Sequence, residues 1–187
     1  MKCSVYIATS VDGYIATPEG AVDWLHSAGN LETDMGDDLD MGFGSFIESV
    51  DCMVMGRKCM DMISSMNLSL EQWPYGDIHI AVLSNTVRTP PENLKGKVEM
   101  FSGKITDLVK TLESKGFKHA YIDGGSTITS FLNHRLIDEM IITRAPVLLG
   151  EGIPLFGKLD NQIRLVNSEA KAFANDFIQI KYRVNYL

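Results

Sequence analysis

Two segments of this chain place glycine directly between an apolar run and a pattern typical of a helix. In the first, Tyr121–Ile128, an apolar run leads into Asp-Gly-Gly-Ser-Thr and then into the helical pattern. A helix that starts in this way presents unpaired N–H groups and the positive end of its dipole, which suits an anion such as phosphate. Many turns of this kind need glycine only for its backbone angles, so the segment alone leaves both interpretations open.

The segment Val54–Lys58 repeats this arrangement and adds positive charge. The apolar run ends at Gly56, and Arg57 and Lys58 follow at the start of a helical stretch. A guanidinium and an ammonium beside a helix N-terminus suit a doubly charged phosphate, because arginine can bind two oxygens at once. The alternative is an ordinary helix start with solvated basic side chains, which is the better interpretation of the pair in isolation.

A third apolar run ends in the small polar residues that follow Leu83. Ser84 and Asn85 are suited to hydrogen-bonding a sugar or a phosphate. Parallel strands end at one edge of their sheet, and open α/β sheets bind ligands in the crevice there. Together the three segments predict a site for an extended phosphorylated ligand.

The elements that position these segments are predicted from hydrophobic patterning. Apolar runs rich in β-branched residues indicate strands buried on both faces, at residues 5–8, 52–55, 78–83, 98–101, 120–122, 140–143 and 163–166. Helical patterns lie between several of them, at 105–112 and at 128–136. Strands that alternate with helices predict an α/β fold with a mostly parallel sheet.

The C-terminal residues follow a different pattern. Ile178, Ile180, Tyr182 and Val184 alternate with polar side chains, which is typical of a half-exposed strand in an antiparallel pair. The expected partner is the strand at 163–166, with the reversal around residues 167–175. The sheet is therefore predicted to be mixed, with a C-terminal antiparallel hairpin.

Composition and charge limit the possible classes of function. The 187 residues, 45% of them hydrophobic, suit a single domain spanning 1–187. A net charge of -7 opposes binding to nucleic acid. No run approaches the roughly 20 apolar residues of a membrane helix, and the first apolar run is too short for a signal peptide. We therefore expect neither a nucleic-acid nor a membrane partner.

The cysteines and histidines indicate no metal site. Cys3, Cys52 and Cys59 have neither the number of a disulfide framework nor the spacing of metal ligands, and the four histidines show no ligand spacing. A reducing, cytoplasmic location is expected.

An acidic segment, Asn30–Asp40, has almost no aliphatic side chains and leads toward a helix. A charge run of this kind usually forms a solvated face, and Asp37 or Asp38 is expected to cap the helix. One of its carboxylates is nevertheless a candidate for chemistry.

The ordered combination of these segments resembles the dihydrofolate reductase superfamily over nearly the whole chain. The resemblance rests on Val54–Lys58, Leu83–Asn85, Ile122–Ser126, Met140–Arg144 and the glycine-rich Leu149–Phe156. Ser10–Ala16 is more similar to the reductase domain of riboflavin biosynthesis, and to its stand-alone relatives, than to folate reductases. The resemblance implies a three-layer fold that binds NADPH and transfers its hydride to a small heterocycle, a pterin or a ribosylaminopyrimidine. It also implies a homodimer, because relatives commonly pair.

By position, the resemblance assigns cofactor contacts to the polar segments. It places Gly56, Arg57 and Lys58 at the adenosine phosphates, Leu83, Ser84 and Asn85 at the adenosine ribose, Gly124, Gly125, Ser126 and Thr127 at the pyrophosphate, and Ala8 and Ile15 at the nicotinamide. The argument from helix N-termini supports the phosphate contacts independently, and no others.

The resemblance also implies substrate and catalytic residues. Reduction of a C=N bond requires a proton on nitrogen, and folate-type relatives use a carboxylate on the helix before the Gly-Arg motif. Counting back from Gly56 without gaps places Asp40 there. The alternative for Asp40 is a solvated helix carboxylate, and riboflavin-type relatives need none. Trp24 and Thr143 are the expected substrate-binding residues, with a lid on the core and an ordinary strand residue as their alternatives.

Two positions depart from the family pattern. Cys59 stands where relatives carry threonine, and a thiol bonds phosphate more weakly than a hydroxyl. Asp123 stands where folate reductases have glycine, and its carboxylate would repel a pyrophosphate unless it points away or binds a hydroxyl. This departure favours the riboflavin-type branch. The second functional hypothesis is a nucleotide-binding module of the same fold that keeps the cofactor site but has lost the substrate carboxylate, without reductase turnover. A P-loop hydrolase is disfavoured because its glycine-lysine motif is missing.

Overall fold

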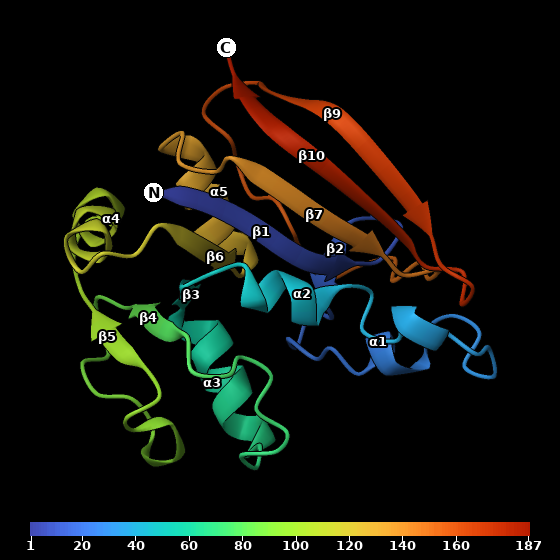
Figure 1. Ribbon diagram of the computed structural model, residues 1–187, viewed down its shortest axis with the longest axis horizontal. Coiled ribbons are helices and arrows are strands. Elements are labelled where there is room, and N and C mark those ends of the chain that lie inside the picture. Colours follow the sequence, from blue (N-terminus) through green and yellow to red (C-terminus); the bar gives the residue numbers. More distant parts are fainter.

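The computed structural model describes all residues, 1–187, with helices on both faces of a central sheet (Figure 1). The strands are β1 (Lys2–Thr9), β2 (Tyr14–Ala16), β3 (Cys52–Gly56), β4 (His79–Leu83), β5 (Glu99–Phe101), β6 (His119–Asp123), β7 (Glu139–Arg144), β8 (Ile153–Pro154), β9 (Ile163–Ala172) and β10 (Ile178–Tyr186). The helices are α1 (Trp24–Ser27), α2 (Phe43–Glu48), α3 (Arg57–Met66), α4 (Ile105–Ser114) and α5 (Gly125–Asn133), with short 3-10 turns η1 (Gly36–Asp38) and η2 (Glu92–Leu94).

The central sheet has eight strands in the order β5-β4-β3-β6-β1-β7-β10-β9. Strands β1 and β3 to β7 are paired in parallel, whereas β10 is antiparallel to both β7 and β9. Strands β2 and β8 form a separate antiparallel pair. The predicted mixed, mostly parallel sheet with a C-terminal hairpin is confirmed.

The hairpin differs from its prediction in where the chain reverses. Strand β9 continues past residue 166 to Ala172, and the reversal is the tight turn in which the Phe173 N–H donates to the Phe177 carbonyl. Asn167 adopts φ 52°, and the pairing register shifts opposite it, between Lys181 and Arg183. The prediction ended the strand early because residues 167–172 are exposed and contain no large hydrophobic side chain, so no hydrophobic alternation marks them.

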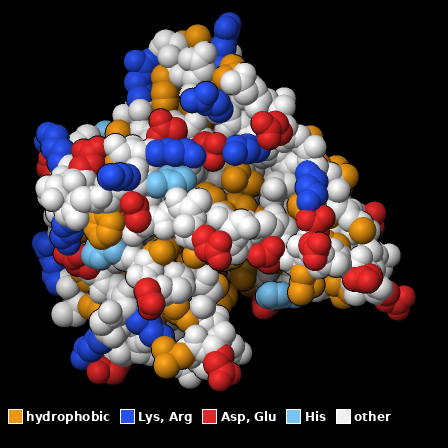
Figure 2. All heavy atoms as spheres, viewed as in Figure 1, with side chains coloured by type: hydrophobic (Ala, Val, Ile, Leu, Met, Phe, Trp, Pro, Cys, Tyr) orange, Lys and Arg blue, Asp and Glu red, His pale blue; other side chains and the backbone are white.

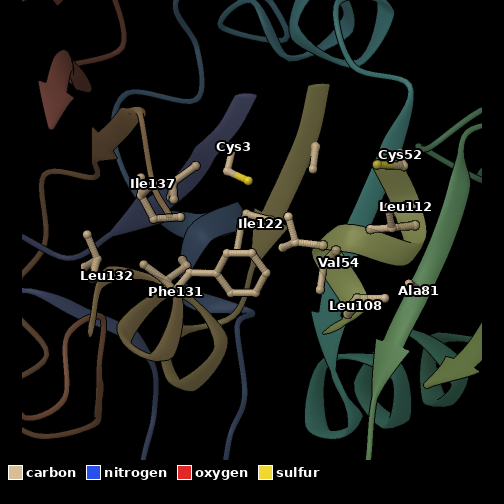
Figure 3. Packing of buried hydrophobic residues seen from close by; sticks show 14 of the residues in the cluster. Cys3, Cys52, Val54, Ala81, Leu108, Leu112, Ile122, Phe131, Leu132 and Ile137 are labelled. Carbon is tan, nitrogen blue, oxygen red and sulfur yellow. The ribbon is translucent and has the colours of Figure 1, made fainter. Parts of the chain in front are cut away.

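One face of the sheet packs against α4 and α5 in a buried hydrophobic cluster. Figure 3 shows Phe131 of α5 reaching toward Ile122 on β6, with Val54 of β3 and Leu108 of α4 beside them. These side chains are at most 2% exposed. Burial of this apolar area is the main contribution to the stability of the fold and fixes where both helices begin.

The opposite face packs against α2 and α3, which completes the predicted three layers. Its buried cluster includes Phe46 of α2, Met60 and Ile63 of α3, and Met53 and Met55 of β3. Because strand side chains alternate, Met53 and Met55 reach this layer while Val54 reaches the other. The methionines therefore fill the space between helix and sheet.

Two helix boundaries differ from the sequence prediction. Helix α5 begins at Gly125 and ends at Asn133, short of the predicted 136, because Arg135 adopts φ 58° and turns the chain. Helix α2 is not capped by Asp37 or Asp38, as was predicted, because those residues form η1. The carboxylate of Asp40 bonds the first amides of α2 instead. No helix is both long and apolar enough to cross a bilayer.

Candidate functional site

The two glycine-led segments lie side by side at one edge of the sheet. Strands β3 and β6 are hydrogen-bonded neighbours, with Met55 opposite Asp123, and Gly56 is opposite Leu83 of β4. Helix α3 starts at Arg57 and helix α5 at Gly125, each directly after its strand. Neither helix has a side-chain cap or an acidic residue in its first turn, so both starts keep N–H groups available to an anion.

The two helix starts are packed against each other. A Cβ built on Gly124 would lie 2.5 Å from Cys59 Sγ, and one built on Gly56 would lie 3.0 Å from Thr127 Oγ1. Gly124 also adopts φ 89°, which L side chains rarely adopt. Glycine is therefore required at Gly124, and at Gly56 a side chain would be tightly packed against Thr127. We call residues 56–59 and 124–127 the cradle.

The loop after β8 and the strand β2 close one end of the cradle. A Cβ on Gly125 would lie 2.9 Å from the Leu155 carbonyl oxygen and 3.1 Å from Ile15 Cδ1. The carboxylate of Asp12 accepts a hydrogen bond from the Gly150 N–H at 2.8 Å, which ties the loop before β8 to the turn after β1. Ile15 thus lies against the start of α5, and Ala8 lies near the end of the adjacent β1; their contact with the nicotinamide stays a prediction.

The third polar segment lies beside the other end of the cradle, on β4. Ser84 is buried, and its Oγ accepts hydrogen bonds from the N–H groups of Thr86 at 3.3 Å and Val87 at 2.9 Å. Asn85 is exposed, and its Oδ1 accepts from Ser102 at 3.4 Å. Ser84 therefore shapes the turn, and Asn85 is the more available of the two for a ligand.

The two basic side chains at the start of α3 differ in their partners. Arg57 Nη1 donates to Asp61 Oδ2 at 2.8 Å, one helical turn along, and both side chains are partly exposed. Lys58 is exposed. An exposed pair of this kind contributes at most about 1 kcal/mol, so a phosphate can take Arg57 from Asp61.

Asp123 forms an unusual acidic centre directly beside the cradle. Burial raises the pKa of this carboxyl above its ordinary value, and contacts with the Gly124 amide, the Tyr121 hydroxyl and Cys59 only partly oppose this. The single hydroxyl hydrogen of Tyr121 has a shorter acceptor, the Tyr6 carbonyl at 2.9 Å, than Asp123 Oδ1 at 3.3 Å. If the Tyr121 hydrogen bonds the Tyr6 carbonyl, the contact between Asp123 and Tyr121 needs a proton on Asp123. The protonated carboxyl can then donate to the Tyr121 oxygen.

Cys59 shares the same buried surroundings. Burial and the neighbouring Asp123 carboxylate raise the pKa of the Cys59 thiol to about 12. A thiol with so high a pKa stays protonated at neutral pH, which makes it a poor nucleophile. Its role here is packing against Gly124.

Asp40 has a different environment from Asp123. Its Oδ1 accepts from the Gly42 N–H and its Oδ2 from the Gly44 N–H, both at 2.8 Å, and the side chain is exposed. These two hydrogen bonds lower the pKa of Asp40. It therefore stabilises the start of α2 as an anion, and a catalytic role for it stays a prediction.

Thr143 belongs to a buried polar cluster on the α2 side of the sheet. Gln179 Nε2 lies 3.0 Å from Thr143 Oγ1, 3.0 Å from the Tyr6 hydroxyl and 3.2 Å from the Met41 carbonyl oxygen. The Tyr6 hydroxyl also donates to Met41 at 2.8 Å. The cluster connects β1, β7 and β10 to the segment just before α2.

Trp24 lies farther from the cradle, in a small separate core formed by α1 and the β9–β10 turn. It packs against Ala28, Ala145, Phe173 and Phe177. Its indole Nε1 is buried and has no acceptor within the chain. An unpaired buried donor is costly, which is a reason to expect a ligand or water acceptor there.

Two surface cavities lie away from the cradle. One of about 590 Å³ is lined only by polar and charged residues, among them Lys2, Glu139 and Arg183. The other, of about 390 Å³, lies between α2 and the strands β1, β7 and β10. Neither cavity is lined by a cradle residue. The candidate phosphate site is therefore identified from the N-termini of α3 and α5 and not from a cavity. No cluster of three His, Cys, Asp or Glu side chains suits a metal ion.

Comparison with known proteins identifies the family. The model of the RibD C-terminal domain matches residues 2–179. The chain belongs to this family. Among solved structures, a protein of Shewanella sp. PV-4 named for riboflavin biosynthesis is 42% identical, with a TM-score of 0.88 and 100% of both chains covered. The dihydrofolate reductase of Enterococcus faecalis, solved with NADP(H), shares the fold at a TM-score of 0.61 and 14% identity, covering 99% of this chain and 97% of that one.

Curated relatives of this RibD-type domain include the Bacillus subtilis (strain 168) protein YwjB. It is 29% identical over 183 residues, which is 97% of each chain. The 5-amino-6-(5-phosphoribosylamino)uracil reductase of Buchnera aphidicola is 32% identical over 92 residues, 49% of this chain and 42% of that protein. The predicted membership of the dihydrofolate-reductase-like superfamily, in its riboflavin-reductase branch, is confirmed.

The RibD-type fold brings most of the predicted cofactor residues together. It keeps two of the predicted catalytic and substrate-binding residues apart from them. The cradle, Ile15 and the end of β4 share one edge of the sheet, whereas Asp40 and Trp24 belong to the α1–α2 region. Sequence reasoning noted Asp123 as a departure but did not propose it as a site residue. The sequence did carry a signal, because Asp123 stands between an apolar strand and two glycines. An acid at the end of a buried strand has its pKa shifted by its surroundings, which is typical of functional sites.

Proposed function

We propose that this RibD-family domain is an NADPH-dependent reductase that transfers a hydride to a pterin or a ribosylaminopyrimidine-type heterocycle. The observation that carries the proposal is the contact between two uncapped helix starts, at Gly56 and Gly124, on neighbouring parallel strands. Such a pair supplies two sets of N–H donors to one elongated polyphosphate ligand. The names of the Buchnera and Enterococcus relatives, both reductases, support the same chemistry.

The residues of the cradle fit the phosphates of NADPH. Gly124, Gly125, Ser126 and Thr127 would bind the pyrophosphate at the start of α5, which carries no competing acid in its first turn. Arg57 and Lys58 would bind the phosphate of the adenosine half, with Leu83, Ser84 and Asn85 beside its ribose. Ala8 and Ile15 would line the nicotinamide. When bound, NADPH supplies the hydride, and the protein aligns donor and acceptor.

Delivery of the proton is assigned to Asp123 rather than to Asp40. A general acid must hold a proton when the substrate is bound, and burial raises the pKa of Asp123 while hydrogen bonds lower that of Asp40, so Asp123 keeps its proton to higher pH than Asp40 does. Asp123 also stands at the strand end from which the cradle starts. Trp24 and Thr143 would contact the substrate on the α1–α2 side.

The second candidate is a nucleotide-binding module without turnover. It is favoured by one observation, the exposure of Asp40 and its use in the start of α2, which leaves the predicted catalytic carboxylate without a buried pocket. The two candidates share the cradle and differ in the second substrate. The homodimer stays a prediction under either.

Cofactor titration followed by a turnover assay tests the proposal. We expect NADPH to bind more tightly than NADH, because the additional phosphate of NADPH reaches Arg57 and Lys58. NADPH should then be oxidised in the presence of a dihydropterin or a ribosylaminouracil. Equal affinity for NADPH and NADH, or no binding of either, would contradict the proposal. Tight NADPH binding without turnover on either substrate class would select the second candidate.

A further inference from the structure

We propose that the part of the sheet that stays open beside α2 binds a second copy of this chain. It is formed by β1, β7, β10 and β9, the last four strands in the order of the sheet. We call it the open face and define it by the side chains of Lys2, Glu139, Lys181, Arg183 and Glu169. The proposal concerns self-association, so it holds or fails independently of the proposed reductase function.

The open face points to the same side of the sheet as α2. Tyr6 of β1 packs against Phe46 of α2 with ring centroids 5.0 Å apart, and Lys2 shares the face of Tyr6 because strand side chains alternate. A cavity of about 390 Å³ lies between α2 and the strands β1, β7 and β10. A second cavity of about 590 Å³ adjoins it, because both are lined by Lys2, Glu139 and Lys181. The surface beside α2 is therefore hollowed and accessible.

Charges alternate in sign from strand to strand across the open face. From β1 to β9 they are Lys2, Glu139, Lys181 and Glu169. The pairing register places Lys181 opposite Glu169, and Arg183 opposite Glu139. Figure 1 shows these four strands above α2, and Figure 2, in the same view, shows basic and acidic side chains alternating there. The open face thus carries a row of alternating charges and not a patch of one sign.

The charges of this row are only partly matched within the chain. Lys2 Nζ lies 3.3 Å from Glu139 Oε1 and Lys181 Nζ lies 3.2 Å from Glu139 Oε2, so one carboxylate serves both ammonium groups. The two lysine side chains remain 45% and 43% exposed. Glu169 and Arg183 are exposed and form no ion pair within the chain. Charges of both signs are therefore available to a partner that also carries both.

The balance of charge disfavours other classes of partner. The larger cavity is lined by three cations and three carboxylates, because Asp138 and Glu169 add to Glu139. Nucleic acid needs a net positive surface, and a basic protein needs a net negative one. The chain as a whole has a net charge of -7, so two copies repel each other over most of their surface. A neutral face is where they can meet without that repulsion.

The row of alternating charges is complementary to its own reverse. A two-fold axis that lies in the interface and crosses the row at right angles, between β7 and β10, reverses the order of strands in the second copy. Lys2 then faces Glu169 of the partner subunit, and Glu139 faces Lys181 of the partner subunit. Each contact occurs twice because the interface is isologous. An axis along the row would instead set like charges against each other, so the pattern selects the first arrangement.

The size of the open face indicates a weak dimer. Four strands about 4.8 Å apart, each covered over about five residues of about 3.3 Å, give a face of roughly 20 Å by roughly 17 Å. Such an area is at the small end of specific interfaces, so we expect a dissociation constant in the micromolar range. Charged contacts across it contribute more to the choice of partner than to affinity.

Sedimentation equilibrium of the full chain measures the self-association. We expect a monomer–dimer equilibrium whose dissociation constant rises several-fold between about 0.05 M and about 0.5 M NaCl, because ions screen the contacts. A monomer at every concentration up to about 1 mM, or a dimer that does not respond to salt, would overturn the proposal.

Charge exchange between Lys2 and Glu169 identifies the interface. Glu169→Lys alone and Lys2→Glu alone each set like charges against each other twice, and each should weaken the dimer by about tenfold or more. An equimolar mixture of the two variants should restore it, because every such contact in the mixed dimer again joins opposite charges. A chain that carries both substitutions should dimerise like the parent for the same reason.

Matched controls lie on α4, in the opposite layer of the molecule. Asp107→Lys and Lys110→Glu are exposed positions that make the same changes in net charge. Both should leave the dissociation constant of the dimer within about twofold of the parent value. Thermal unfolding checks that each variant folds, since Lys2→Glu also removes a partner of Glu139. If Lys2→Glu fails to fold, Glu169→Lys against Asp107→Lys still decides whether the open face is the interface.

Each outcome bears on one claim. Equal weakening by Glu169→Lys and Asp107→Lys would overturn the proposal, because net charge and not the open face would then control association. A mixture of folded variants that stays monomeric would overturn the arrangement that pairs Lys2 with Glu169. No cradle residue is changed, so the Kd for NADPH should stay within about twofold in every variant. Loss of NADPH binding in the parent chain would contradict the proposed function and leave the measured dimer unaffected.

Discussion

Cys59 Sγ occupies the space that a side chain on Gly124 would need. The two residues belong to different helix starts, and a Cβ on Gly124 would lie 2.5 Å from the sulfur. Real Cβ contacts essentially never come so close, so the sulfur or the strand end must move if a side chain is added. The geometry of the cradle therefore depends on a pair of residues far apart in the sequence.

Gly124→Ala should destabilise the protein and weaken cofactor binding together. The substitution adds steric overlap with Cys59 to the cost of a side chain at φ 89°, and we expect a loss of about 2–4 kcal/mol in the free energy of unfolding. Chemical denaturation measures this loss, and titration with NADPH measures the binding.

The matched control for this prediction is Gly116→Ala. Gly116 follows α4, has φ 94° and has nothing within 4 Å of a built Cβ, so it reports backbone strain alone, about 1–2 kcal/mol. The double variant Gly124→Ala with Cys59→Ala should recover the part of the lost unfolding free energy that comes from steric overlap with the sulfur. Equal losses for the two single variants would show that Cys59 does not restrict the site.

Asp61→Asn should strengthen binding of NADPH and leave binding of NADH unchanged. The carboxylate of Asp61 holds the Arg57 guanidinium at 2.8 Å and would compete with the additional phosphate of NADPH under the proposed function. Since exposed pairs are worth at most about 1 kcal/mol, the expected gain is about two- to fivefold in Kd. Fluorescence titration with both cofactors, with Asp107→Asn as the control, measures it; an equal gain for NADH would refute the competition.

Local patterns in the sequence predicted those features of the fold and the candidate site that depend on residues close together in the chain. Strand, glycine and helix start are consecutive at Gly56 and at Gly124, so their order follows from the sequence. The mixed sheet followed from the change from continuous to alternating hydrophobicity at the C-terminus. Exposed strand residues at 167–172 carried no such signal, and the hairpin was therefore predicted too short.

The sequence could not predict the relationships that depend on packing between distant elements. Asp40 looked like a candidate acid from its position before the Gly-Arg motif, but its exposure and its bonds to Gly42 and Gly44 arise only in the folded chain. Asp123 looked unfavourable beside a pyrophosphate unless it bound a hydroxyl. In the fold, the Tyr121 hydroxyl lies 3.3 Å from Asp123 Oδ1 but has a shorter acceptor in the Tyr6 carbonyl at 2.9 Å, so the contact with Asp123 suits a protonated carboxyl.

The pH dependence of turnover should follow the protonation of Asp123. Because burial raises the pKa of this carboxyl, the acid form persists to higher pH than usual, and the rate should fall as pH rises through the raised value. Asp123→Asn should lower kcat by about 10²-fold or more and flatten the profile. Steady-state rates across pH measure both, and an unchanged profile in the variant would remove Asp123 from proton delivery.

Asp123→Asn should lower kcat but raise the stability of the fold at neutral pH. A carboxyl whose pKa is higher in the folded than in the unfolded chain stabilises the fold fully below the unfolded value, and this contribution is lost as pH rises through the folded value. Asp123→Asn should therefore melt at a higher temperature than the parent protein at neutral pH. The difference should shrink on acidification to about pH 3, where the ordinary carboxyl is largely protonated. A variant that is less stable at neutral pH would contradict the raised pKa.

Asp40 can be tested by separating its structural role from its charge. Asp40→Ala removes both acceptors of the Gly42 and Gly44 amides and should cost about 1 kcal/mol of stability, as is typical of lost helix-start bonds. Asp40→Asn keeps one acceptor oxygen and removes the negative charge, so it should cost less. If proton delivery depends on Asp123, kcat of Asp40→Asn should stay within about twofold of the parent value, because an exposed carboxylate with a lowered pKa holds no proton at neutral pH. A loss of kcat in Asp40→Asn as large as that in Asp123→Asn, with unfolding unchanged, would instead return the catalytic role to Asp40.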